Sequence, residues 1–171
     1  MDKNKRLLPK LILGFLSLLV AVLGMGVIHV YSQKPAPLTG RELAAMPLQT
    51  LNNGIKNFGH IKQETALIVT FASWCPSCRE EQPFLMELKA EGVPLYGLAW
   101  LDEDAKTAAF LNEMGNPFIW TYTDNKGEAT RPLGISGTPE TFVVKNGYII
   151  FKYAGPITPK IWNDVLKPMM G

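Results

Sequence analysis

The sequence contains few cysteines and few histidines, with two of each among 171 residues. A structural zinc site needs about four ligands, but the only histidines are His29, inside an apolar run, and His60, which has no partner pattern. A zinc site is therefore the least supported use of the two cysteines, and no metal or other cofactor is expected. The chain also has no internal repeat and no low-complexity stretch.

Excess charge of either sign is nearly absent, because the whole chain carries a formal net charge of +2. Residues 1–30 hold four basic residues and one acidic residue, which leaves 13 basic and 14 acidic residues in the remainder. A near-neutral remainder gives no reason to expect binding to nucleic acid or to an anionic membrane surface.

The two cysteines form a C-x-x-C motif, Cys75-Pro76-Ser77-Cys78, directly after an apolar run at 67–71. An apolar run followed by this motif predicts a buried strand that gives way to a helix. The unpaired N–H groups and positive dipole end of a helix N-terminus favour thiolate over thiol, and Pro76 suits the first helical position. Cys78 then lies one turn on, where it can attack a mixed disulfide at Cys75. The motif indicates thiol–disulfide exchange.

Two other interpretations of the cysteines stay open. A purely structural disulfide is disfavoured because its stabilisation grows with the length of the closed loop, and this loop holds two residues. Two inert buried cysteines are ordinary in a protein core, but Trp74 and Pro76 at a strand–helix junction argue against that interpretation.

The N-terminal 31 residues predict a membrane anchor. A basic segment, 1–10, precedes 21 uncharged and mostly apolar residues at 11–31, and about 20 such residues can cross a bilayer as a helix. The alternative, a cleaved signal peptide, has a shorter apolar region that ends in small residues. The basic end is expected to stay in the cytoplasm, so the rest of the chain is expected in the bacterial periplasm, with the anchor in the inner membrane.

After a proline-containing linker at 32–39, residues 40–171 are long enough for one domain. The pattern predicts a mixed central sheet with helices on both faces, in which Asn146-Gly147 makes a hairpin turn and Thr158 caps the last helix. The predicted strands are 48–51, 66–71, 93–100, 118–123, 140–144 and 148–153, and the predicted helices are 75–90, 104–114, a short one at 128–133, and 158–165.

This order of elements, with Trp-Cys-x-x-Cys opening a helix, resembles the thioredoxin fold. The segment Gly134-Ile-Ser-Gly-Thr-Pro-Glu-Thr-Phe142 supports the resemblance, since thioredoxin-like proteins carry a cis proline before the hairpin, packed against the cysteines. The resemblance implies that Pro139 is cis and that Thr138 offers backbone groups to a substrate strand.

Four segments together are similar to the CcmG/DsbE family, membrane-anchored periplasmic thiol–disulfide proteins of cytochrome c maturation. They are Trp74–Glu81, Gly115–Phe118, Gly137–Phe142 and Ala154–Thr158. As in that family, the spacing from Cys78 to Pro139 leaves room for an extra strand–helix element. The fold class is therefore expected to be thioredoxin-like α/β with that insertion, preceded by one transmembrane helix.

The resemblance implies a reductase that keeps the C-x-x-C-H cysteines of apocytochrome c reduced. Its partners would be apocytochrome c, or a protein that handles the apocytochrome thiols, and a membrane thiol–disulfide carrier that supplies electrons. A general periplasmic thioredoxin-like reductase or oxidase, and a non-catalytic anchored docking scaffold, stay open as alternatives.

By this resemblance, Cys75 is the expected nucleophile and Cys78 is the expected resolving cysteine. The strand position that holds an aspartate in thioredoxin is Val69 here, so Glu140 is the candidate proton acceptor, with a solvent-facing hairpin carboxylate as its alternative. Glu80 and Glu81 are expected to be first-turn acids that favour the helix dipole. The residues expected to contact substrate are Trp74, Pro76, Thr138 and Pro139.

Overall fold

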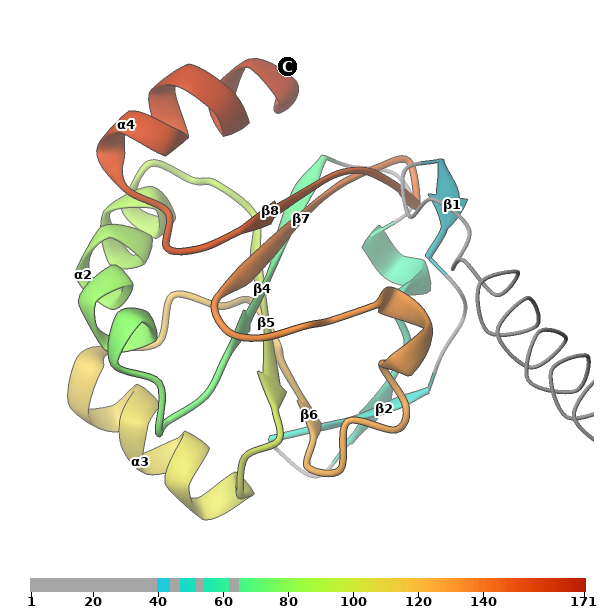
Figure 1. Ribbon diagram of the computed structural model, residues 1–171, viewed down its shortest axis with the longest axis vertical. Coiled ribbons are helices and arrows are strands. Elements are labelled where there is room, and N and C mark those ends of the chain that lie inside the picture. The colour runs from blue at the N-terminus through green and yellow to red at the C-terminus, as the bar shows by residue number, and fades with distance from the viewer. Residues whose placement is uncertain (1–39, 44–46, 52–53, 62–64) are drawn as a thin grey trace, which may run out of the picture. The chain divides into compact units, whose positions relative to one another are not determined.

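The computed structural model describes residues 40–43, 47–51, 54–61 and 65–171, which contain one eight-stranded mixed sheet (Figure 1). The strands are β1 (Arg41–Glu42), β2 (Leu48–Thr50), β3 (Ile55–Lys56), β4 (Ala66–Phe71), β5 (Leu95–Trp100), β6 (Thr121–Asp124), β7 (Glu140–Lys145) and β8 (Tyr148–Ala154). The helical segments are α2 (Pro76–Ala90), α3 (Asp104–Met114), α4 (Pro159–Ile161), the π-helix η3 (Trp162–Leu166), and the 3-10 helices η1 (Phe58–Ile61), η2 (Arg131–Leu133) and η4 (Lys167–Met169).

The strand order is β1-β8-β7-β4-β5-β6-β2-β3, with β4 at the centre of the sheet. β5 runs parallel to both β4 and β6, whereas β7 pairs antiparallel with β4 and β8. The predicted hairpin is confirmed, because Asn146 and Gly147 both adopt positive φ angles, 54° and 83°, as a tight turn between twisted strands requires.

The apolar run at 66–71 forms a strand because both of its faces are covered, as predicted for a central strand. Leu67, Val69 and Phe71 belong to the core on the helix side, and Ala66 and Ile68 belong to the core on the other side. Every residue of β4 is buried. The strand therefore ends at a fixed position in the molecule, directly before the two cysteines.

The prediction of helices on both faces of the sheet is only partly right. α2, α3 and the C-terminal helical run from α4 to η4 lie on one side, whereas η1 and η2 lie on the other (Figure 1). Pro132 interrupts the segment predicted as a short helix at 128–133, which makes only the three-residue helix η2. Proline supplies no N–H for a longer helix, so loops and 3-10 turns cover that face.

Several predicted elements have the expected bounds and others are shifted. β4 and α3 coincide with their predicted ranges, and α2 begins one residue after Cys75. β6 begins at Thr121 rather than at 118. The Phe118 N–H donates to Asn116 Oδ1 at 3.0 Å instead of to a neighbouring strand, and the Phe118 ring stacks on Phe71 with centroids 5.0 Å apart. Between Cys78 and Pro139 the chain forms β5, α3, β6 and η2. The extra strand–helix element expected there stays a prediction.

The predicted basic tail 1–10, anchor 11–31 and linker 32–39 lie outside the described residues. Within the ranges that the structure describes, no helix has the length and apolar character needed to cross a bilayer.

Candidate active site

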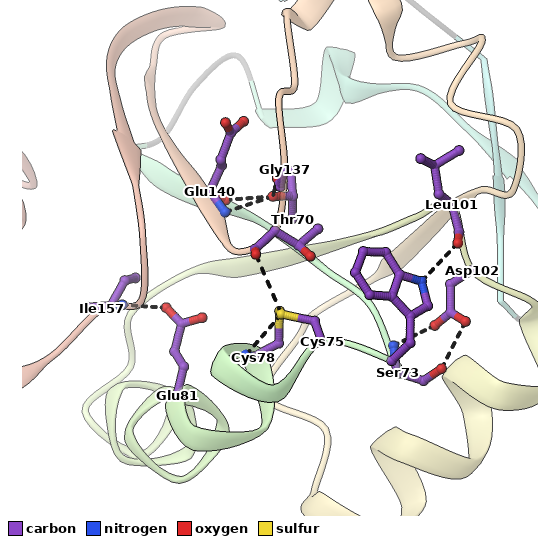
Figure 2. Close-up of a disulfide and its surroundings, with 12 residues drawn as sticks. Thr70, Ser73, Cys75, Cys78, Glu81, Leu101, Asp102, Gly137, Glu140 and Ile157 are labelled. Carbon is purple, nitrogen blue, oxygen red and sulfur yellow. Dashed lines mark hydrogen bonds between the residues drawn. A yellow bond between two sulfur atoms is a disulfide. The ribbon is translucent and has the colours of Figure 1, made fainter.

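Cys75 and Cys78 lie where β4 gives way to α2, and a disulfide joins them (Figure 2). Cys75 is the N-cap residue of α2 and Pro76 is in its first turn. Both cysteines are almost fully buried, with exposed fractions of 3% and 1%. The strand–helix junction predicted from the sequence is therefore present, and it holds both sulfur atoms within the helix-side core.

Two backbone groups from different parts of the chain approach the Cys75 sulfur. The N–H of Cys78 donates a hydrogen bond to Cys75 Sγ at 3.2 Å, and the carbonyl oxygen of Thr138 lies 3.5 Å from the same sulfur. An N–H donor at a helix N-terminus favours the thiolate form of Cys75 after reduction. The nearby carbonyl oxygen works against a negative charge there.

The Thr138–Pro139 peptide bond is cis, as the resemblance implied, and the loop that contains it is fastened to β4 by Thr70. Thr70 Oγ1 accepts the N–H of Glu140 at 2.8 Å and donates to the carbonyl oxygen of Glu140 at 3.1 Å. Thr70 and Glu140 are also register partners of the β4–β7 pair. These bonds bring residues 137–139 against the disulfide, although Thr138 and Cys75 are 63 positions apart in sequence.

Glu140, the proton acceptor expected from the sequence, is buried with its carboxylate directed away from the sulfur atoms (Figure 2). Its Oε2 pairs with Lys152 Nζ at 2.8 Å, and its Oε1 accepts hydrogen bonds from the N–H and the hydroxyl group of Ser136. Lys152 also donates to the carbonyl oxygen of Gly134 at 2.8 Å. The contacts of Glu140 are those of a residue that holds the loop before Pro139.

Glu81 is the buried carboxylate on the helix of the two cysteines, in contrast to the first-turn acid expected from the sequence. It is 3% exposed, whereas its neighbour Glu80 is exposed to solvent. Glu81 Oε1 accepts the N–H of Ile157 at 2.6 Å, and its Oε2 has no hydrogen-bond partner in the described structure. Burial raises the pKa of Glu81 to about 7, and the Ile157 hydrogen bond opposes the rise.

The prediction of first-turn acids is therefore wrong for both Glu80 and Glu81, because α2 begins at Pro76 and its first turn contains no acidic residue. A signal in the sequence could have identified its position. The buried residues of α2 recur at helical spacing, and Glu81 follows Cys78 by three positions, which places the two side chains on one face of the helix.

Asp102, which sequence analysis missed, fixes the turn before the cysteines. It is buried, and its two carboxylate oxygens accept the N–H and the hydroxyl group of Ser73 at 2.6 and 2.8 Å. They also accept the N–H of Glu103 and the hydroxyl group of Thr107. Asp102 thereby ties the turn at Ser73 to the start of α3, and no local sequence pattern announces a contact across 29 residues.

The predicted substrate-contact residues surround Cys75 in the structure. Trp74 is 56% exposed, and its Nε1 donates to the carbonyl oxygen of Leu101 at 3.0 Å. Pro76 is exposed and Pro139 is buried, while the Oγ1 atom of Thr138 is buried without a partner in the described structure. In the described part of the chain, no cluster of three or more His, Cys, Asp or Glu side chains could hold a metal ion.

The sequence matches the family model described as Redoxin over residues 34–166. It is 32% identical to the thiol:disulfide interchange protein DsbE of Pseudomonas aeruginosa, over 96% of this chain and 93% of that protein. It is 36% identical to the protein of that name from Haemophilus influenzae, over 97% of this chain and 95% of the relative. A thiol:disulfide interchange protein of the thioredoxin family from Chlorobium tepidum has the same fold, with a TM-score of 0.63, 21% identity, and coverage of 80% of this chain and 99% of that chain.

We expect Asp102→Ala to lower the free energy of unfolding by roughly 2–4 kcal/mol, because the partly buried Ser73 N–H and the buried Thr107 hydroxyl group lose their acceptor. Urea unfolding measures this change. The reduced variant should also react more slowly with iodoacetamide at Cys75, since the turn that sets the N-cap geometry is released. Glu113→Ala, which removes an exposed ion pair with Arg79, serves as the control and should cost less than about 1 kcal/mol. Equal stability of the two variants would contradict this assignment.

Proposed function

The chain belongs to the Redoxin family and to its DsbE thiol:disulfide interchange proteins, and we propose that it reduces disulfides of apocytochrome c in the periplasm, or those of a protein that handles the apocytochrome thiols. The observation that carries this proposal is the placement of Cys75. Its sulfur caps α2 and accepts the Cys78 N–H, while the loop before Pro139 lies beside it. That arrangement suits attack on a disulfide presented along the loop.

The proposed cycle begins with both cysteines reduced. The Cys75 thiolate attacks one sulfur of the substrate disulfide, so a Cys75–substrate bond forms as the substrate S–S bond breaks and the first substrate thiolate leaves. The Cys78 thiolate then attacks Cys75 Sγ, which forms the Cys75–Cys78 disulfide seen in the structure and releases the second substrate thiolate. The substrate gains two electrons, and the protein loses them.

Glu81 is the group that we propose to take the proton of Cys78 in the second step. A general base works best when its pKa is close to the working pH, and the pKa of Glu81 is about 7. Glu81 and Cys78 are three residues apart on α2, and both are buried. The contacts of Glu140 with Lys152 and Ser136 make it the weaker candidate for the same role.

Apocytochrome c is proposed as substrate because of the family resemblance and the chemistry of haem attachment. The attachment motif is C-x-x-C-H, and a disulfide between its cysteines blocks thioether formation. Each turnover leaves Cys75 and Cys78 oxidised, so a membrane thiol–disulfide carrier must return two electrons. Trp74, Pro76, Thr138 and Pro139 would contact the substrate chain around Cys75.

Residues 11–31 are proposed as a single-pass anchor in the bacterial inner membrane, with residues 1–10 in the cytoplasm and the domain at 40–171 in the periplasm, joined through the linker 32–39. The uncharged stretch is long enough to span a bilayer, and the basic residues before it favour this orientation. The DsbE relatives align with 96–97% of the chain, so the alignments include most of this segment.

Cys78→Ala should accumulate mixed disulfides between Cys75 and the natural substrate, because the resolving thiol is absent. We expect non-reducing electrophoresis and mass spectrometry of the full chain expressed in a bacterium to identify cytochrome c maturation components or apocytochrome c. The Cys75→Ala/Cys78→Ala double variant is the control and should trap nothing. Recovery of general periplasmic proteins alone would favour the broad-reductase alternative.

The reduction potential of the Cys75–Cys78 pair tests the direction of transfer. We expect a value well below that of the oxidant DsbA, about −120 mV, when the full chain is equilibrated with glutathione buffers and the dithiol fraction is determined by alkylation. A potential at or above that of DsbA would contradict a reductase.

Glu81→Gln should slow the release of substrate from the Cys75 mixed disulfide by roughly 100-fold at pH 8. In the unaltered chain this rate should rise with pH through about 7, because Glu81 must lose its proton to act as a base. The variant should lack that rise. Stopped-flow measurement with a fluorescent peptide disulfide follows the step, in which Cys75 does not titrate because it is covalently bound.

Glu80→Gln is the matched control for this experiment, since Glu80 lies on the same turn of α2 and is exposed. It should retain both the rate and the pH dependence. A Glu81→Gln profile that still rises through pH 7 would place the base elsewhere.

A further inference from the structure

Two exposed apolar residues are linked beside the first cysteine, through a hydrogen bond between the indole of one and the backbone of the other. The large apolar residues exposed in the described structure are Ile55, Trp74, Leu101, Ile119 and Tyr148. Of these, Trp74 and Leu101 are joined by the hydrogen bond from Trp74 Nε1 to the Leu101 carbonyl oxygen, and Trp74 directly precedes Cys75 (Figure 2). We call this pair the Trp74–Leu101 surface.

The backbone of Leu101 is held in a conformation that leucine rarely adopts. Its φ is +52°, in the left-handed region that costs an ordinary residue roughly 1–2 kcal/mol and that glycine or asparagine tolerates better. The Leu101 N–H donates to the Asp124 carbonyl oxygen at 3.0 Å, and the next residue, Asp102, is fixed by its own network. Backbone strain of this kind persists where the surrounding structure determines it, and it gathers at functional sites.

Core packing does not account for leucine at this position either. Its side chain is 42% exposed and lies over Gly127, where an added Cβ would come within 3.1 Å of Leu101 Cδ2. Leu101 thus combines an unfavourable backbone φ with an apolar side chain that is partly exposed to solvent. The contacts within the described chain therefore leave part of the Leu101 side chain open to a partner.

We propose that the Trp74–Leu101 surface receives a large apolar side chain of the partner polypeptide, a few residues from the cysteine under attack, and that Leu101 thereby determines substrate selectivity. This inference rests on the proposed disulfide exchange at Cys75. The partner is a polypeptide because the proposed substrate is the disulfide of a protein. One of its sulfur atoms must come within about 2 Å of Cys75 Sγ to form the mixed disulfide.

The chain on either side of that sulfur then crosses the surface next to Cys75. A residue two or three positions from the reacting cysteine is within roughly 7–11 Å of it along an extended chain. Trp74 is the neighbour of Cys75 in sequence, and its indole is tied to Leu101. An apolar partner side chain therefore meets this surface in the same encounter that joins the two sulfur atoms.

Synthetic peptides with one C-x-x-C disulfide test the inference. In each peptide a single leucine occupies one of the three positions before or after the cysteines, and a matched peptide has serine there. The full chain, purified in detergent and reduced, is mixed with each peptide, and second-order rate constants are measured by stopped flow. Rates with glutathione disulfide, which has no such side chain, normalise each variant for the reactivity of its thiolate.

We expect leucine at one or more positions to raise the normalised rate about tenfold over serine, as the burial of one apolar side chain can supply.

Leu101→Asn should reduce that ratio to near one. Asparagine tolerates positive φ, and the backbone carbonyl group that accepts the Trp74 hydrogen bond remains. Ile119→Asn, which removes a remote apolar side chain that is 53% exposed, should keep the tenfold ratio. Leu101→Gly, free of strain at this φ, should behave like Leu101→Asn.

The outcomes separate the two proposals. Failure of the unaltered chain to exchange with glutathione disulfide and with every peptide would overturn the proposed function, and this inference with it. Exchange without preference for leucine, or a preference that survives in both Leu101 variants, would overturn the inference and leave the proposed function standing.

Discussion

The active site depends on the hydrogen bonds between Thr70 and Glu140, which join the end of β4 to the start of β7. β4 determines where Cys75 lies, and β7 determines where the loop before Pro139 lies. With Thr70 as the link, the Thr138 carbonyl oxygen comes to 3.5 Å from Cys75 Sγ. For a substrate chain that binds along this loop, as proposed, two neighbouring strands of the buried sheet would set its position relative to the sulfur.

Two buried glutamates near this link differ in their partners. Glu140 faces Lys152 and Ser136, so its charge is compensated and it holds the loop. The pKa of Glu81 is raised to about 7, because burial is opposed only by the N–H of Ile157. A raised folded-state pKa means that stability from this group is full below its unfolded value of 4.5 and falls as pH rises to about 7, by roughly 3 kcal/mol. That loss of stability near neutral pH is consistent with a carboxylate retained for proton transfer.

The elements that were predictable from sequence are those with a local cause. β4 follows from six consecutive core residues, the hairpin from Asn146-Gly147, and the N-terminus of α2 from Pro76 after Cys75. The edge strands β1 and β3 contain two residues each, too few for the alternating pattern of a strand to be recognised in the sequence.

The roles of Asp102 and Glu140 depend on partners that only the folded chain brings close. Glu81 is the intermediate case, because its spacing from Cys78 was visible in the sequence but was outweighed by the expectation of a first-turn acid.

The environment of Cys75 balances reactivity against oxidising power. Stabilising the thiolate makes Cys75 a better leaving group and a more abundant nucleophile, but it also favours the dithiol form and raises the reduction potential, as in DsbA. Here the Cys78 N–H and the helix N-terminus favour the charge, whereas burial and the Thr138 carbonyl oxygen oppose it. These opposing contributions limit the stabilisation of the thiolate. We therefore expect the reduced form of this pair not to be strongly favoured over its oxidised form, which would let it donate electrons to a disulfide.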